Sequence, residues 1–366
     1  MASSTVERVI RNVSLDDKYA LDTARAYMTG IEALVRLPML QHQRDQQRGL
    51  NTAAFVSGYR GSPLGGVDQA FWKAGPWLEK HNVHFQPGVN EELAATAVWG
   101  SQQTDLAGGA RYDGVFGMWY GKGPGVDRSM DVFKHANAFG TSRYGGVLAV
   151  AGDDHACKSS TLPHQSEHNF IAASMPVLSP SNVQEVLDLG IYGWELSRYS
   201  GCWVALKAIT ENMDSAISAE IDPARIQITI PEGFELPPGG VHARWPDKPM
   251  EQEARLNRYK IYAAREFARV NGINRVVVDS PRARLGIITS GKLSAIGLDM
   301  WQQSFETDLW SVIHGCRILL PLLVDSGGGH LVNVASAAGL LGPPDLASYG
   351  VAKAGVISLS ESLAVE

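Results

Sequence analysis

The chain has 366 residues, 45% of them hydrophobic and 19% charged, which is enough for two or three domains with well-buried cores. Its formal net charge is −6, and its lysines and arginines are scattered, so nothing indicates a nucleic acid or an anionic membrane as partner. Three cysteines, none in a C-x-x-C pair, exclude a disulfide framework and an iron–sulfur cluster held by this chain.

The amino-terminal residues are polar and mixed in charge, unlike a signal peptide. No apolar run approaches the roughly 20 residues that a membrane span needs. We therefore expect a cytoplasmic protein without a membrane partner.

Short apolar runs alternate with amphipathic stretches, a pattern typical of an α/β layered fold. The predicted strands are Thr52–Ser57, Gly114–Trp119, Gly146–Ala151, Cys202–Ala208 and Leu285–Thr289. The predicted helices are Asp16–Leu37, Gly66–Glu79, Glu91–Leu106, Val126–Asn137, Val183–Tyr199 and Glu251–Asn271.

A glycine loop follows the first predicted strand, within the segment Phe55–Gly66. Gly58 and Gly61 allow the backbone to approach a ligand or another chain closely. Ser62 and Pro63 predict the start of a helix, with Ser62 as the N-cap and Pro63 at the first helical position. The spacing does not fit the G-x-G-x-x-G dinucleotide pattern, so a tight strand-to-helix turn remains an equal alternative to a ligand-binding loop.

Two glutamates, Glu91 and Glu92, stand at the start of a predicted helix that is rich in alanine. Carboxylates at this position are stabilised by the helix dipole, which explains them without any catalytic role. The small side chains of the helix indicate close packing against another element.

Two further polar segments, Met118–Arg128 and Ala151–His168, directly follow predicted strands. The ends of parallel strands are where α/β sheets place their ligands. The second segment contains five potential metal ligands, namely Asp153, Asp154, His155, His164 and His168. Their spacing matches no standard ligand pattern, so we interpret them as solvated loop residues and predict no metal site.

Several of these segments recur in a known order. They are SGYRGSPLGG, NEELAATA, MWYGKGPGVDRSMDVFKHAN, GDDHACKSSTLPHQSE, RWPDKPMEQEARLNRYK and VVVDSPRARLGIITSGK. Together they span nearly all of residues 20–292 and resemble the amino-terminal part of the large indolepyruvate ferredoxin oxidoreductases of aerobic bacteria. The resemblance implies a thiamine-diphosphate pyrimidine-binding domain over residues 1–280, with a parallel sheet flanked by helices. Residues 281–292 would then be the truncated start of a transketolase-C-like domain.

The same resemblance implies a site and its cofactor. Glu91 would contact the aminopyrimidine ring of thiamine diphosphate, and we place Gly58, Gly61 and Ser62 at the same cofactor site. The reaction would be oxidative decarboxylation of a 2-oxoacid, with a ferredoxin-type electron acceptor. The family holds magnesium and the diphosphate with a Gly-Asp-Gly motif, which this sequence lacks. We therefore expect other subunits or domains to supply the diphosphate-binding and iron–sulfur modules, and the chain to be inactive alone.

The composition changes near residue 292. Residues 1–292 carry 30 Lys and Arg against 31 Asp and Glu, whereas residues 293–366 carry 2 against 7. In this last part, Trp301–Val324 has apolar residues at helical spacing, His330–Ser336 predicts a buried strand, and Ser348–Glu366 predicts a second helix.

Ser336, Tyr349 and Lys353 form a pattern in which Tyr and Lys share one helix face at i, i+4. A nearby ammonium group lowers the pKa of a tyrosine by favouring the phenolate. With NVASAAG and SYGVAKAG around them, these residues resemble the short-chain dehydrogenase/reductase family. The resemblance implies Tyr349 as catalytic acid/base, Ser336 as carbonyl-positioning residue and Lys353 as ribose contact, on a partial Rossmann-like helix–strand–helix fragment over residues 293–366.

This second resemblance is incomplete. Asp308 stands where the family has an asparagine, and the family's T-G-x-x-x-G-x-G loop for NAD(P) does not occur in the sequence. Three hypotheses follow: a partial thiamine-dependent oxidoreductase subunit, which we favour; an NAD(P)-dependent short-chain dehydrogenase carried by residues 293–366; and an inactive chimeric or truncated product.

Overall fold

The computed structural model describes residues 14–20, 23–106, 108–155, 157, 161–276, 288–291, 304–327, 330–341 and 347–365. These residues divide into two units, Met1–Arg275 and Val276–Glu366, here called the front unit and the tail unit. The predicted division into 1–280, 281–292 and 293–366 stays a prediction, because residues 277–287 and 292–303 lie outside the described residues.

The front unit is built on a six-stranded parallel sheet in the order β3-β2-β4-β5-β7-β6. Its strands are β2 (Thr52–Gly58), β3 (Val83–Phe85), β4 (Gly114–Lys122), β5 (Val147–Asp153), β6 (Val177–Leu178) and β7 (Trp203–Ile209). Every residue of β5 is buried, as expected for a central strand covered on both faces. The four strands predicted in this unit correspond to β2, β4, β5 and β7, so the α/β fold class is confirmed. Of the fifth predicted strand, residues 285–287 lie outside the described residues, and 288–290 are not in a strand.

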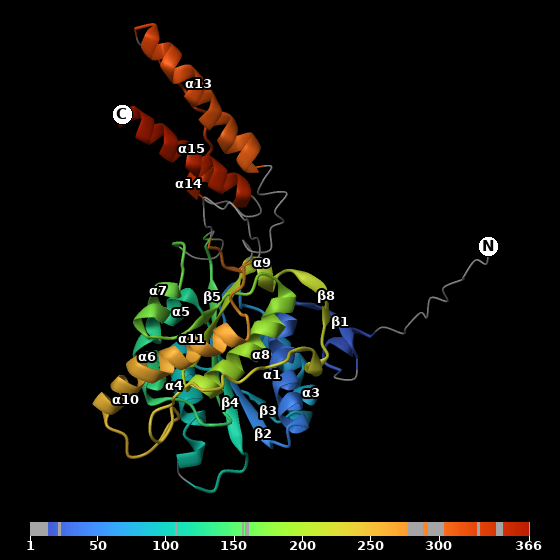
Figure 1. The fold of residues 1–366 in the computed structure, drawn as a ribbon. Coiled ribbons are helices and arrows are strands. Elements are labelled where there is room, and N and C mark those ends of the chain that lie inside the picture. Colours follow the sequence, from blue (N-terminus) through green and yellow to red (C-terminus); the bar gives the residue numbers. More distant parts are fainter. Residues whose placement is uncertain are drawn as a thin grey trace, which may run out of the picture. The chain divides into compact units, whose positions relative to one another are not determined.

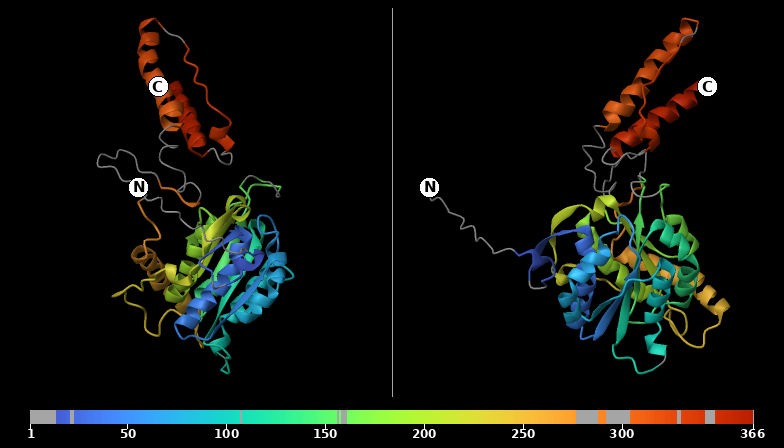
Figure 2. Two further views of the ribbon diagram at one scale, coloured as in Figure 1. Left: turned by 90° about the vertical axis from the view of Figure 1, so that its right-hand side faces the viewer. Right: turned by 180° about the vertical axis from the view of Figure 1, so that it is seen from behind.

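Helices cover both faces of this sheet (Figures 1 and 2). They are α1 (Gly30–Gln47), α2 (Val67–Lys73), α3 (Gly75–Lys80), α4 (Glu91–Ser101), α5 (Gly123–Arg128), α6 (Met130–Phe139), α7 (Glu167–Ala172), α8 (Val183–Ser200), α9 (Thr210–Met213), α10 (Pro249–Arg255) and α11 (Ile261–Val270). Side chains alternate along β4: Met118 and Tyr120 pack in one apolar cluster with α1, α2 and α8, whereas Trp119 packs in the other with α4, α5 and α6. The sheet therefore lies between two separate apolar layers.

The predicted helix Asp16–Leu37 is correct only from Gly30 onward and wrong before it. Arg25–Thr29 forms strand β1, which pairs antiparallel with β8 (Ala216–Glu220), and α1 begins only at Gly30. Thr29 caps α1 through a capping box, in which its hydroxyl accepts from the Glu32 amide and the Glu32 carboxylate accepts from the Thr29 amide. The strand exists because of a partner nearly 200 residues away, which local periodicity does not reveal.

The described residues of the tail unit include a π-helical turn (Phe305–Trp310), α13 (Ser311–Asp325), α14 (Ala338–Leu341) and α15 (Ala347–Val365). Both predicted helices are confirmed over the described residues, whereas residues 301–303 of the first lie outside them. The predicted buried strand His330–Ser336 is wrong: these residues are in no strand, and Val332 and Val334 are 82% and 77% exposed. A single extended segment has no ladder of hydrogen bonds unless a neighbouring strand pairs with it.

One described helix, Phe305–Asp325, is long and apolar enough to cross a membrane, with a mean hydropathy of 1.3 and 6% of that stretch buried. Length and composition are the only basis for this, and core helices of soluble proteins pass the same test.

Candidate functional site

The predicted motifs of the front unit meet at the carboxyl edge of the sheet. Strand β2 ends at Gly58, β4 at Lys122 and β5 at Asp153, and these three strands are neighbours in the sheet. The loops that follow them, together with the first turn of α4, form the candidate site, at the edge where parallel sheets bind ligands.

Glu91 and Glu92 are distinguished by their surroundings. Asn90 caps α4, its side chain accepting from the Leu93 amide at 2.8 Å, and Glu91 is the first helical residue. Glu91 is half-buried, and its carbonyl accepts a hydrogen bond of 2.9 Å from the indole Nε1 of Trp119. Glu92 is exposed. Of the two carboxylates, Glu91 therefore lies in the candidate site.

The Glu91 side chain rests on two glycines, Gly121 at the end of β4 and Gly125 in α5 (Gly123–Arg128), here called the glycine cradle. A Cβ atom on Gly125 would lie 2.4 Å from Glu91 Cγ and 2.9 Å from its Oε1, and a Cβ on Gly121 would lie 3.4 Å from Glu91 Cγ. Any side chain at position 125 would displace the carboxyl group. Glycine at position 125 is thus required by the close approach of Glu91.

The glycine loop after β2 lies beside this cradle. A Cβ on Gly58 would lie 2.1 Å from the Tyr120 carbonyl oxygen, and one on Gly61 would lie 2.9 Å from Lys122 Cβ. The loop therefore packs against the end of β4 at both glycines. Ser62 is half-buried and precedes a cis peptide bond to Pro63. The predicted helix start at Ser62 is wrong, because the residues form a turn and α2 begins at Val67.

A polar cluster lies at the ends of β5 and β7. His164 contacts Asp127 Oδ2 through Nε2 at 2.9 Å and Asp153 Oδ1 through Nδ1 at 3.5 Å. Lys207 Nζ lies 3.5 Å from Asp153 Oδ2 and also pairs with Glu167, and this ammonium group lowers the pKa of Glu167 against the opposing effect of burial. These polar contacts tie the ends of β5 and β7 to α5 and α7.

The interpretation of this segment as solvated is wrong in part. Asp153 and Asp154 are 1% and 3% exposed, and the His164 side chain is 17% exposed, whereas His155 and His168 are exposed as expected. Within the ranges that the structure describes, His, Cys, Asp and Glu side chains form no group of three arranged to hold a metal ion. The sequence analysis missed the partnership of His164 with Asp127. The only available signal was the position of both residues after neighbouring strands.

In the tail unit, α15 carries Tyr349 and Lys353 on one face, with Lys353 Nζ 5.5 Å from the centre of the Tyr349 ring. Lys353 Nζ also lies 3.3 Å from Asp308 Oδ1, and both side chains are largely buried. Ser336 is half-buried, and its carbonyl accepts from the Gly339 amide at 2.9 Å, which places it at the turn into α14. The structure thus brings Tyr349 and Lys353 together with Asp308, the residue that stands where the short-chain dehydrogenase family has an asparagine.

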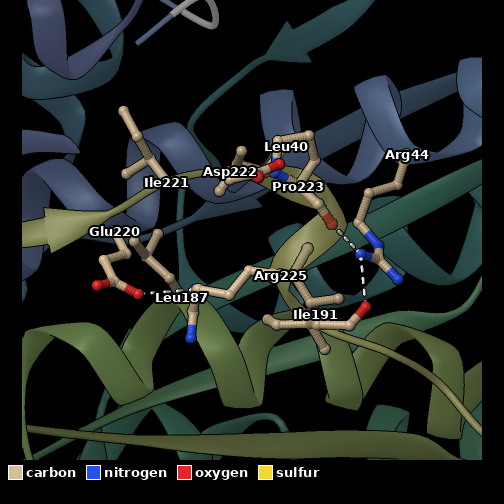
Figure 3. Close-up of a pocket in the computed structure, with 10 residues that line it drawn as sticks. Leu40, Arg44, Leu187, Ile191, Glu220, Ile221, Asp222, Pro223 and Arg225 are labelled. Atoms are coloured by element: carbon tan, nitrogen blue, oxygen red, sulfur yellow. Dashed lines mark hydrogen bonds and ion pairs between the residues drawn. The ribbon is translucent and has the colours of Figure 1, made fainter. Parts of the chain in front are cut away.

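Two hollows lie away from the carboxyl edge. One, between α1, α8 and the segment after β8, has a volume of about 10 Å³ and is closed by Arg44, which donates to the Pro223 and Ile226 carbonyls (Figure 3). It has room for one water molecule at most. The other is an open groove of about 420 Å³ near the amino ends of β2 and β3, where the Phe55 and His84 rings stack. Neither hollow includes a predicted site residue.

Comparison with known proteins separates the chain into the same two parts. Residues 282–366 match the family model "short chain dehydrogenase". This match also takes in most of the segment 281–292. The probable galactose dehydrogenase GalD of Rhizobium meliloti is 38% identical over 72 residues, which cover 20% of this chain and 28% of that protein.

Most of the chain is similar to a different kind of oxidoreductase. The indolepyruvate oxidoreductase subunit IorA of Methanothermobacter marburgensis is 25% identical over 305 residues, 79% of this chain and 44% of that protein. The IorA subunit of Methanothermobacter thermautotrophicus is 23% identical over 290 residues. The chain therefore spans less than half the length of these relatives. A solved 2-oxoglutarate:ferredoxin oxidoreductase of Magnetococcus marinus matches 68% of this chain and 46% of its own chain, with a TM-score of 0.44 and 16% identity.

Proposed function

We propose that the front unit forms the pyrimidine-binding half of a thiamine-diphosphate site in a 2-oxoacid oxidoreductase. The observation that supports this most directly is the half-buried carboxyl group of Glu91 resting on the glycine cradle at the carboxyl edge of the sheet. A carboxyl group placed so can hydrogen-bond the ring nitrogen of an aminopyrimidine. The glycines let the Glu91 side chain lie directly against the backbone at the strand ends, which fixes the place of its carboxyl group.

Within this proposal, each residue has a defined task. Glu91 exchanges a proton with the pyrimidine ring, and Gly58, Gly61 and Ser62 bring the backbone after β2 close to the cofactor. Bound thiamine diphosphate supplies the electron sink for decarboxylation of the 2-oxoacid. The substrate class that the resemblance suggests is an aryl pyruvate, and the electron acceptor is a ferredoxin-type protein in the cytoplasm.

The proposal requires partners. The sequence lacks the Gly-Asp-Gly motif and the clustered cysteines that would hold magnesium, diphosphate and iron–sulfur clusters. We therefore assign these tasks to other subunits or domains, and we expect the isolated chain to bind the cofactor weakly and to have no oxidoreductase activity.

Saturation-transfer NMR with thiamine diphosphate and Mg²⁺ tests the proposal, because it detects weak binding. We expect saturation of the pyrimidine protons in the unaltered chain, loss of this signal in Glu91→Gln and retention in Glu92→Gln, the matched control from the same helix turn. Equal signals from both variants would contradict a role for Glu91, and no signal with the unaltered chain would contradict the site.

A second candidate function, an NAD(P)-dependent dehydrogenase in the tail unit, is favoured by the Tyr349–Lys353 pair. The Asp308 carboxylate opposes it, because its ion pair with Lys353 neutralises the ammonium group beside the tyrosine. A ligand at a hundredfold excess over its Kd stabilises the folded state by about 2.7 kcal/mol. A thermal shift of this size with NADH or NADPH, abolished by Tyr349→Phe with Lys353→Met, would establish this function in place of the first.

A further inference from the structure

The first turn of α5 passes between two ionisable side chains. A Cβ on Gly125 would lie 2.4 Å from Glu91 Cγ, and a Cβ on Gly123 would lie 2.0 Å from His164 Nδ1. Glu91 comes from α4, whereas His164 comes from the loop between β5 and α7. A short stretch of backbone without side chains on these faces thus separates the carboxyl group from the imidazole.

His164 links this stretch to the sheet. Its Nε2 lies 2.9 Å from Asp127, which belongs to α5 itself, and its Nδ1 lies 3.5 Å from Asp153 at the end of β5. Asp153 is fixed in turn, since it accepts hydrogen bonds from the Ser166 amide at 2.9 Å and the Ser166 hydroxyl at 2.7 Å, and Lys207 Nζ lies 3.5 Å away. The imidazole therefore joins α5, a helix of only six residues, to the buried end of β5.

The position of the Glu91 carboxyl group depends on the same stretch from the other side. The Glu91 backbone is held by the hydrogen bond from Trp119 Nε1 at 2.9 Å, whereas the Glu91 side chain rests on the glycine cradle. If the first turn of α5 moves, the surface under the carboxyl group moves with it. Loss of the contact between His164 and Asp127 would loosen this turn, which Asn169 also holds by donating to Asp127.

We propose that His164 is a positioning residue for Glu91. By holding Asp127 to Asp153, it fixes the turn Gly123–Gly125 and thereby the place and surroundings of the carboxyl group. The link to catalysis rests on the proposed function of Glu91, whereas the link between His164, α5 and Glu91 does not.

The test uses the full chain with three variants at His164 and Asp127 and a matched control. His164→Ala removes both contacts, His164→Gln retains one donor, and Asp127→Asn weakens the contact on α5 at a side chain that is 54% exposed. His135→Ala is the control, because His135 is exposed on α6 and lies 3.7 Å from an aspartate, Asp131.

Two readouts are measured for each variant: amide hydrogen exchange of residues 121–128, and the carboxyl ¹³C resonances of Glu91 and Glu92 across a pH titration. We expect His164→Ala to speed exchange in α5 roughly tenfold or more, in line with the loss of hydrogen bonds to charged groups. It should also change the titration curve of Glu91 but not that of Glu92. His164→Gln should recover part of both effects, and His135→Ala should show neither.

A Glu91 titration curve that is unchanged in both His164→Ala and Asp127→Asn would overturn the proposal. If His164→Ala does not fold, the Asp127→Asn result decides alone. The cofactor experiment separates the two claims: a changed Glu91 curve without any thiamine-diphosphate signal keeps the positioning role and removes the proposed function. An unchanged curve with a cofactor signal that Glu91→Gln abolishes does the reverse.

Discussion

Lys260 offers a test of the front unit's packing through pH. Its side chain is completely buried at the end of a π-helical turn, Leu256–Lys260, and its ammonium group donates to the Asn137 carbonyl. Burial lowers the pKa of Lys260 from its ordinary value of 10.5 to about 8. The unfolded chain therefore binds this proton more tightly than the folded protein does, so the folded state is penalised wherever Lys260 is charged.

The sign and size of the effect follow from linkage. Below pH 8 the lysine is protonated in both states and the penalty is complete; it is relieved as the pH rises from 8 to 10.5. A difference of this size corresponds to about 3 kcal/mol in total, of which about 1.4 kcal/mol is recovered between pH 7 and pH 9. Lys260→Met removes the titrating group and keeps much of the side-chain volume.

Urea unfolding at pH 7 and pH 9, followed by tryptophan fluorescence, measures this difference. We expect the free energy of unfolding of the unaltered chain to rise by about 1.4 kcal/mol relative to Lys260→Met between these pH values. Lys134→Met, at an exposed position on α6, is the control and should follow the unaltered chain. Parallel behaviour of the unaltered chain and Lys260→Met would refute the reasoning.

Three further outcomes are expected. Arg198→Met should destabilise the front unit by about 3–5 kcal/mol in urea unfolding, because it leaves the buried Asp45 carboxylate without its cationic partner and without the two hydrogen bonds of 2.7 and 2.8 Å that Arg198 donates. Burial lowers the pKa of His81 to about 4, so stability should fall as the pH drops from 6.5 towards 4. For this half-exposed ring we expect about 1 kcal/mol of that loss by pH 5, absent in His81→Gln. In the tail unit, a double-mutant cycle of Asp308→Ala and Lys353→Met, measured by hydrogen exchange of α15, should give a coupling of about 0.5–1 kcal/mol; zero coupling would show that the ion pair does not contribute.

The central fold of the front unit could be predicted because its signals are local. The run Val147–Ala151 is apolar from end to end, as expected for a central parallel strand, and Asn90 and Asn182 mark the first turns of α4 and α8. The strand Arg25–Thr29 was missed because its partner, Ala216–Glu220, is distant in the sequence. Its own residues alternate in burial only because that pairing exists.

The candidate site was predictable in its location but not in its contacts. Glycines and carboxylates after successive strands indicated the carboxyl edge of the sheet, and this edge is where Glu91 and the glycine cradle meet. The choice between Glu91 and Glu92 depends on which of two adjacent helical positions faces β4. From the sequence, only the family resemblance indicated Glu91. No sequence rule pairs His164 with Asp127, because two separate loops must first fold before these side chains meet.

The two units differ in how many apolar side chains they bury. The front unit buries two apolar clusters, one on each face of its sheet. Among the described residues of the tail unit, the buried apolar side chains are Cys316, Ala352 and Val356, while Val332 and Val334 are exposed in a segment that pairs with no described strand. Since apolar burial is the main favourable contribution to folding, the tail unit gains far less stability from its own residues. A catalytic tyrosine needs rigid surroundings to keep its geometry. The Tyr349–Lys353 pair lies in the unit with less apolar burial, and Glu91 lies in the unit with more. We place the proposed function in the front unit because of this difference in apolar burial, more than because of the similarity of either part to known enzymes.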